Sequence, residues 1–199
     1  MKTLFATLLA VVLCFSSPQA WPTEQSILPL KSDGHAFCTA FSINAKEKLW
    51  ATARHCAAFA QQHDLDVTID GYWALPIYVS PDNDLAVFQS GAKGVPLTLS
   101  AYAPEVGDKV LVSGYPWGLP VLVETRGTVA VRFIVVMGSG TSDILDIAVA
   151  PGNSGSPVLN SQGQVIGVLW GMSDKGGHAF SITWETVRRQ LGPFFQKVA

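Results

Sequence analysis

The sequence contains, at residues 151–157, the stretch PGNSGSP, in which a serine lies between two glycines in a run of turn-forming residues. Runs rich in valine, isoleucine and leucine flank it, which predicts a tight turn between two β-strands. Gly152 can adopt backbone angles closed to other residues and so turn its N–H inward, beside the N–H of Ser154. Two such donors would form an oxyanion hole. By composition alone, however, such a cluster is more often a surface turn than a reactive site.

Two further segments carry side chains that suit Ser154 chemically. His55 lies in ATARHC at residues 51–56, and Asp84 begins an apolar run within DNDLAV at residues 82–87. A serine hydroxyl needs a base to take its proton, histidine titrates near neutral pH, and a carboxylate behind the imidazole fixes its tautomer. Singly, His55 also fits a half-buried residue at a strand end, and Asp84 fits a turn residue. The three together indicate a catalytic triad.

The pattern from residue 21 onward is all-β, because short apolar runs alternate with Gly, Pro, Asn and Asp. Such spacing favours a closed barrel or a pair of barrels over a parallel sheet with crossover helices. Gly127 is expected to mark a turn or bend inside the longest run. About eleven candidate strands are predicted, over residues 36–43, 49–53, 65–69, 73–79, 85–89, 109–113, 121–136, 144–149, 157–160, 165–170 and 178–182.

Only two helices are expected. A turn or two follows Cys56 at residues 57–62, and a C-terminal helix covers residues 184–197. Thr183 is a suitable N-cap for the second helix, whose residues Val187 and Leu191 share one face. Pro193 is expected to kink or restart it. Residues 90–107, rich in Gly, Pro and Ala, are expected to connect two β-rich halves.

The first twenty residues have the pattern of a secretory signal peptide. Lys2 supplies a positive start, an apolar run of about a dozen residues follows, and Ala20 offers a cleavage site. A buried N-terminal helix is the alternative. Removal leaves residues 21–199, and no second run is long enough to span a membrane. The protein is therefore expected to be secreted or periplasmic, without membrane attachment after cleavage.

Charge and cysteine content narrow the function classes. The net charge of −2 is spread along the chain, so no basic stripe indicates nucleic-acid binding. Cys38 and Cys56 remain after cleavage, an even number that suggests a disulfide in an exported protein, with free buried thiols as the alternative. Neither belongs to a C-x-x-C pair, so no metal is expected. No cofactor is expected either.

At this point the chain resembles the trypsin-like serine peptidases, and within them the HtrA (Deg) branch. Residues 52–56 (TARHC) are similar to the T-A-x-H-C motif of that family. Residues 84–87 (DLAV), 151–155 (PGNSG) and 114–119 (GYPWGL) resemble the aspartate motif, the nucleophile turn and a G-x-P-x-G loop of the HtrA branch. The resemblance covers nearly all of residues 36–190.

The resemblance implies two six-stranded antiparallel β-barrels, at about residues 24–100 and 107–183, followed by the C-terminal helix. It implies a Ser154, His55, Asp84 triad acting on polypeptides through an acyl-enzyme, with Gly152 and Ser154 as the oxyanion hole. It also implies a Cys38–Cys56 disulfide that holds the histidine segment to the preceding strand. The oligomeric state stays open.

The sequence departs from the family pattern in three places. Asn153 stands where digestive members carry an aspartate that pairs with a newly cut N-terminus, so activation by such cleavage is not expected. Arg54 replaces a small residue before the histidine; a solvent-facing side chain is expected, with substrate contact or pairing with Asp82 as alternatives. Few residues follow the expected C-terminal helix, so a PDZ domain of the kind found in full HtrA proteins is not expected.

Substrate preference is inferred from the resemblance alone. Ala148 would lie near the base of the primary specificity pocket with Val149 beside it, and residues Leu169, Trp170 and Gly171 would form a wall. This lining lacks an acid, which favours small or apolar residues before the scissile bond. His178 lies in a matching pocket strand and would instead favour Glu or Gln if it faced substrate.

Two other functions remain open. A catalytically silent binding module would need a hidden defect such as a collapsed oxyanion turn. An esterase or other acyl hydrolase could use the same triad. The G-x-S-x-G elbow of α/β-hydrolases is absent, as is the H-E-x-x-H motif of zinc peptidases.

Overall fold

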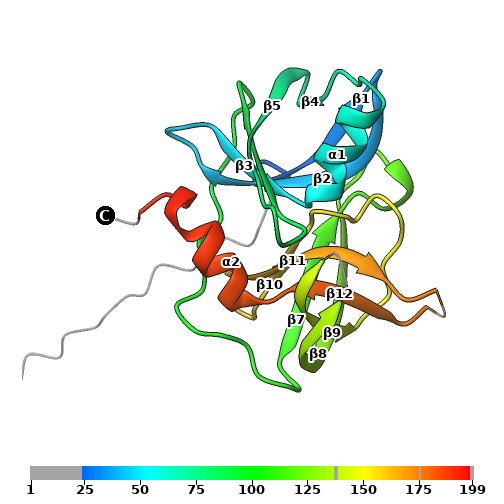
Figure 1. Ribbon diagram of the computed structural model, residues 1–199, viewed down its shortest axis with the longest axis vertical. Coiled ribbons are helices and arrows are strands. Elements are labelled where there is room, and N and C mark those ends of the chain that lie inside the picture. The colour runs from blue at the N-terminus through cyan, green and yellow to red at the C-terminus, as the bar shows by residue number, and fades with distance from the viewer. Residues whose placement is uncertain (1–23, 137–138, 175, 198–199) are drawn as a thin grey trace, which may run out of the picture.

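The computed structural model describes residues 24–136, 139–174 and 176–197, which form two closed β-barrels (Figure 1). The expected signal peptide lies outside the described residues. Within the described residues, no helix is long and apolar enough to cross a membrane. The prediction of two six-stranded antiparallel barrels is confirmed.

The first barrel closes in the order β1-β2-β3-β6-β5-β4. The nine-residue helix α1 follows β3, and its first residue directly precedes His55. The elements are β1 (Ile27–Ser32), β2 (His35–Asn44), β3 (Leu49–Thr52), α1 (Arg54–Gln62), β4 (Thr68–Ile69), β5 (Tyr72–Val79) and β6 (Ala86–Ser90).

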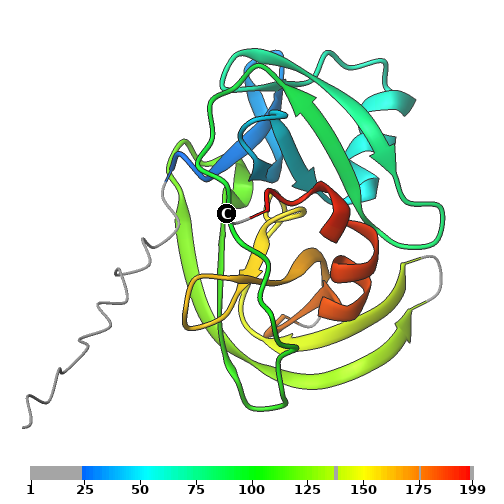
Figure 2. The same cartoon turned by 90° about the vertical axis from the view of Figure 1, so that its left-hand side faces the viewer.

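The second barrel closes in the order β10-β11-β12-β9-β8-β7 and carries the C-terminal helix. Its long β8–β9 hairpin wraps around one side, as Figure 2 shows. The elements are β7 (Lys109–Gly114), η1 (Pro116–Gly118), β8 (Val123–Val136), β9 (Gly140–Asp146), β10 (Pro157–Leu159), β11 (Val165–Met172), β12 (His178–Ile182), α2 (Trp184–Gln190) and η2 (Gly192–Phe194).

Three local predictions need correction. Strand β1 was not among the predicted strands; it pairs with β2 and β4 and closes the first barrel. Gly127 is not a turn but lies inside the continuous strand β8, where a Cβ would overlap the carbonyl oxygen of Asp146. The C-terminal helix ends at Gln190 rather than residue 197, because Pro193 cannot continue an α-helix and the chain restarts as η2.

A single buried apolar cluster joins the two barrels. Phe41 and Ile43 of β2 pack in it with Leu111 and Val168 of the second barrel, and Val187 of α2 caps it. The barrels are thus held together by burial of apolar surface, which contributes about 25 cal/mol per Å².

The C-terminal segment returns to the first barrel. The backbone N–H of Gln196 donates to Ile43 O at 2.8 Å, and its side-chain oxygen accepts from Ala45 N at 3.1 Å. The Asn44 side chain donates to Phe194 O at 3.3 Å. This C-terminal strap, residues 194–196, fastens β2 to the end of the chain.

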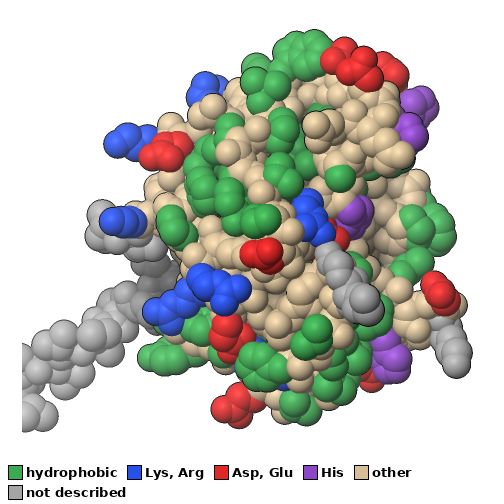
Figure 3. All heavy atoms as spheres, viewed as in Figure 1, with side chains coloured by type: hydrophobic (Ala, Val, Ile, Leu, Met, Phe, Trp, Pro, Cys, Tyr) green, Lys and Arg blue, Asp and Glu red, His purple; other side chains and the backbone are tan. Residues whose placement is uncertain are grey.

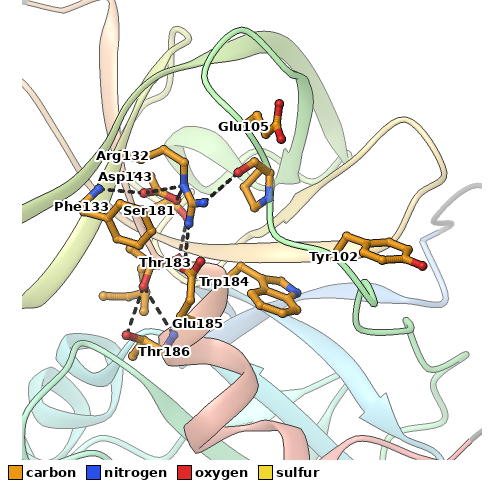
Figure 4. A network of polar contacts seen from close by, with 12 residues as sticks. Tyr102, Glu105, Arg132, Phe133, Asp143, Ser181, Thr183, Trp184, Glu185 and Thr186 are labelled. Carbon is orange, nitrogen blue, oxygen red and sulfur yellow. Dashed lines mark hydrogen bonds and ion pairs between the residues drawn. The ribbon is translucent and has the colours of Figure 1, made fainter.

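Arg132, whose side chain is only 12% exposed, ties the inter-barrel connection to the second barrel (Figure 4). Arg132 of β8 pairs with Asp143 of β9 at 3.3 Å and with Glu185 of α2 at 2.7 Å, and donates to Pro104 O at 2.8 Å. Burial raises the pKa of the Asp143 carboxyl, an effect that Arg132 opposes. One side chain therefore joins four separate segments.

Replacing Arg132 with methionine is expected to lower the free energy of unfolding by about 3–5 kcal/mol at pH 7, because the Asp143 carboxylate is left buried without its partner. Without Arg132 the folded-state pKa of Asp143 rises further above its unfolded value. Protonation then favours the folded state, so the loss is largest at neutral pH and shrinks as the pH falls toward the unfolded value of the aspartate.

Urea denaturation at pH 7 and near pH 4.5 measures this difference. Arg126→Met on the same strand is the matched control, since Arg126 is exposed and its pair with Glu124 spans 3.8 Å; a change below about 0.5 kcal/mol is expected there. Equal losses at both pH values for Arg132→Met would contradict the account.

Candidate active site

His55 and Asp84 meet at the ends of two paired strands. Thr52 ends β3 and lies opposite Ala86 at the start of β6, so the residues just beyond each strand are neighbours. Asp84 is buried and accepts two hydrogen bonds, from the His55 backbone N–H and from Nδ1, both at 2.8 Å. With the carboxylate as acceptor, Nδ1 carries the hydrogen and Nε2 is left to accept a proton.

The turn that carries Ser154 lies against the histidine segment. Thr39 N donates to Ser154 O at 2.8 Å, and Gly155 N donates to Leu169 O at 2.7 Å. Gly155 has a φ of +86° and packs so closely that a Cβ would overlap Thr52 Oγ1. The glycine-rich turn of the second barrel is therefore in direct contact with the segment of the first barrel that leads to His55.

Ser154 is half-buried and lines a small pocket at the surface. Among the described residues, no hydrogen bond joins Ser154 Oγ to the His55 imidazole. In unliganded enzymes such bonds are often long and tighten only when substrate binds. The turn nevertheless brings all three predicted residues to one seam between the barrels.

The peptide groups around Gly152 are oriented by specific partners. Trp117 N donates to Pro151 O at 2.6 Å, and Ser156 N donates to Asn153 O at 2.9 Å. Because a trans peptide directs its N–H opposite to its C=O, these bonds turn the N–H groups of Gly152 and Ser154 the other way. Gly152 adopts a φ of +97°, which few residues other than glycine reach.

The predicted disulfide is confirmed. Cys38 of β2 is bonded to Cys56 of α1, with a Cα–Cα distance of 6.2 Å. Together with His55 these residues form a compact cluster of possible metal ligands, with ligand atoms within 4.8 Å of one another. Since both sulfurs are in the disulfide, neither is a thiolate that could bind a metal.

A small pocket of about 230 Å³ opens beside Ser154. Three of the predicted specificity residues line it, namely Val149, Leu169 and Gly171. The sequence did not suggest Met172, which also lines it, although it directly follows the predicted wall. The remaining lining residues are Ala150 and Pro151.

Three predicted pocket residues do not line this pocket. Ala148 is exposed outside it. Trp170 instead donates through Nε1 to Ser142 Oγ at 3.0 Å and stacks on Phe180. His178 is exposed, with Nδ1 at 4.0 Å from the Asp146 carboxylate.

A model of the trypsin-like peptidase domain matches residues 38–168. The chain belongs to this family. Protease Do-like 2, chloroplastic, from Arabidopsis thaliana is 34% identical over 136 residues, or 60% of this chain and 21% of the relative. A probable periplasmic serine endoprotease, DegP-like, from Chlamydia muridarum is 36% identical over 118 residues, or 54% of this chain and 22% of the relative.

The chain spans about a fifth of the length of these curated relatives. Among solved structures, the active form of the Rv3671c protease from M. tuberculosis has a TM-score of 0.70 at 21% identity, and the match covers 100% of this chain and 97% of that one. The peptidase fold is thus shared, and the predicted likeness to the HtrA/Deg branch is confirmed by the relatives.

Arg54 of this peptidase domain does not simply face solvent, as the sequence suggested. Its guanidinium donates to Ser80 O at 3.2 Å and to Pro81 O at 2.9 Å, in the loop that leads to Asp84. The residue before the histidine therefore holds the loop that carries the aspartate.

A second, larger groove of about 440 Å³ lies between α1 and β5 of the peptidase domain. Hydrophobic side chains gather over the first barrel on the face shown in Figure 3. Trp73 and Leu75 of β5 line the groove and are mostly exposed. His55, Asp84 and Ser154 do not line it.

Proposed function

We propose that this chain is an exported serine endopeptidase in which Ser154 is the nucleophile, His55 the general base and Asp84 the residue that orients it. The observation that carries the proposal is the pair of 2.8 Å hydrogen bonds from His55 to the buried Asp84, beside a serine in a turn whose two glycines have positive φ. Membership in the trypsin-like peptidase domain family supports it.

The geometry supports a two-step reaction. Ser154 Oγ attacks the carbonyl carbon of the scissile bond while His55 Nε2 takes the hydroxyl proton. The Gly152 and Ser154 N–H groups hold the oxyanion that forms. The C–N bond then breaks, the leaving amine takes the proton from Nε2, and the acyl group stays on Ser154. Water attacks this ester with His55 again as base, which releases the acid and restores the serine.

The orientation of Gly152 supports an active site over a silent one. If the Pro151 carbonyl pointed into the hole, it would repel an oxyanion. Trp117 N holds that carbonyl away, at 2.6 Å. A preformed hole of this kind stabilises the transition state without reorganisation during the reaction.

The pocket beside Ser154 favours small or medium apolar residues before the scissile bond. Val149, Leu169 and Met172 line a space of about 230 Å³ with few polar atoms. His178 does not line it, which argues against a Glu or Gln preference.

A fluorophosphonate probe followed by peptide mapping tests the catalytic assignment. Modification of Ser154 in the folded protein, absent after heat denaturation, is expected. Unlabelled protein is assayed separately on fluorogenic peptides with Ala, Val, Lys or Glu before the scissile bond, and on a matched ester. No labelling would indicate a binding module, and ester cleavage without amide cleavage would indicate an esterase. Faster cleavage after Lys or Glu would overturn the pocket assignment.

Export follows from the sequence pattern of residues 1–20, and a periplasmic name among the relatives supports it. N-terminal sequencing of protein recovered outside the cytoplasm is expected to begin at Trp21. Recovery of protein that still begins at Met1, in the cytoplasm only, would contradict export.

A further inference from the structure

One threonine at the seam between the barrels uses every polar atom it has. Thr39 of β2 is fully buried. Its N–H donates to Ser154 O at 2.8 Å, and its carbonyl accepts from Thr52 Oγ1 at 2.7 Å. Its hydroxyl donates to Gly152 O at 2.8 Å and accepts from Tyr115 N at 3.1 Å. Through these four bonds, Thr39 joins the end of β3, Tyr115 and the turn that carries Ser154.

The bond to Gly152 O lies between the two candidate oxyanion donors. The Gly152 N–H belongs to the peptide that Trp117 holds through Pro151 O, and the Ser154 N–H belongs to the peptide that Ser156 holds through Asn153 O. The peptide between them, from Gly152 to Asn153, is held by the Thr39 hydroxyl. Its direction sets the angle between the two donor peptides.

The hydroxyl has only one way to donate. Because Tyr115 N is a donor and occupies a lone pair of Thr39 Oγ1, the hydroxyl hydrogen is directed at Gly152 O. Tyr115 is itself fixed, since its phenol donates to Ile27 O at 3.0 Å. Burial, with a smaller effect of Glu24, raises the pKa of the Tyr115 phenol to about 12, so the phenol keeps the hydrogen that it donates to Ile27 O. With Tyr115 fixed in this way, the Thr39 hydroxyl has a defined orientation.

We propose that Thr39 is a positioning residue that sets the relative orientation of the Gly152 and Ser154 N–H donors through its hydroxyl bond to Gly152 O. The proposal rests on the proposed function, since it concerns the hole that would hold the oxyanion. The Ser154 carbonyl is held by the backbone of Thr39 and not by its side chain. A substitution of the Thr39 side chain therefore removes the bond that orients the oxyanion hole and keeps the backbone bond to Ser154.

Thr39→Val tests the proposal, because valine has nearly the shape of threonine without the hydroxyl. Loss of a complete oxyanion donor lowers kcat by roughly 10²–10³-fold; a misoriented donor is expected to lower it by about 10- to 100-fold, with KM within about twofold. Thr39→Ser keeps the hydroxyl and is expected to stay within about threefold of the wild-type kcat.

Each variant is assayed on a fluorogenic peptide with alanine before the scissile bond, and the active sites of a separate aliquot are titrated with a fluorophosphonate. Titration separates loss of folded molecules from loss of turnover per site. A peptide boronic acid, whose adduct with serine is tetrahedral, provides the second readout: its affinity is expected to fall with kcat in Thr39→Val and to recover in Thr39→Ser. Where Thr39→Val does not fold, Thr39→Ala supplies the same comparison.

The two possible failures are distinct. If wild-type protein neither labels nor cleaves the peptide, the proposed function is wrong. If wild-type protein cleaves and Thr39→Val has the wild-type kcat per titrated site and the wild-type boronic acid affinity, the role of Thr39 is wrong. A rise in KM at unchanged kcat would also overturn it, because the hole acts on the transition state.

Discussion

Ser154→Ala, His55→Ala and the double variant are each expected to lower kcat by roughly a million-fold, and by nearly the same factor. The effects do not add because the imidazole serves only to move the serine proton: once either group is lost, the other has nothing to do. The oxyanion donors and the pocket remain, so a small rate above that of uncatalysed hydrolysis is expected to persist.

Steady-state assays on a fluorogenic peptide, with fluorophosphonate labelling alongside, measure these variants. Ser161→Ala and His35→Ala are the matched controls, because both residues are exposed and neither lines the pocket beside Ser154; both are expected to keep wild-type kcat. A double variant much slower than either single variant would mean that Ser154 and His55 act independently, against the proposed mechanism.

Asp84→Asn is expected to lower kcat by about 10⁴-fold while the protein stays folded. Asp84 accepts one hydrogen bond at each carboxylate oxygen, from His55 N and from Nδ1. An asparagine has one acceptor and one donor, so it cannot satisfy both. Its NH₂ group either opposes the backbone N–H or faces Nδ1, and the second arrangement puts the hydrogen on Nε2, where it blocks proton transfer from Ser154.

The rate of fluorophosphonate labelling at Ser154 is expected to fall with kcat, and the melting temperature to fall little. Asp64→Asn is the control, since Asp64 is exposed and its φ of +51° is one that asparagine tolerates well. Unchanged labelling in Asp84→Asn would remove Asp84 from the triad.

The barrels were predictable because most of their strands show the strand pattern of short apolar runs between turn residues. β1 did not, since Pro29 and the polar Lys31 and Ser32 break the strand pattern. It forms because it has two partners: Pro29 lies opposite Thr39, and Leu30 lies opposite Ile69 of β4. Tertiary pairing here overrides local preference.

Glycines illustrate why a residue type alone does not identify a local structure. From the sequence, both Gly127 and Gly152 were predicted to lie in turns or bends. Gly152 does adopt a positive φ at a turn, whereas Gly127 lies in an extended strand, where a passing backbone leaves no space for a Cβ. Whether a glycine is needed for its positive φ or for lack of space depends on the chain segment packed against it. The residues next to the glycine in the sequence do not reveal that segment.

In the candidate site, too, some residues could be predicted from the sequence and others could not. His55, Asp84, Ser154 and the disulfide partners stand out by motif, so they were predicted. Thr39 does not, because its hydroxyl partners lie 76 and 113 positions away along the chain. The family resemblance placed Trp170 in the pocket wall, but its indole N–H donates to Ser142 instead. Contacts made across the seam need the folded chain.

The C-terminal strap fastens a strand of the first barrel with residues that are synthesised last among those that hold the site. A chain leaves the ribosome from its N-terminus, so β2 is made long before Phe194 and Gln196, which fasten it. His55 and Asp84 are synthesised with the first barrel, Ser154 with the second, and the fastening residues last. A chain that stops before residue 194 therefore lacks the hydrogen bonds that fasten the end of β2, the strand that also carries Thr39.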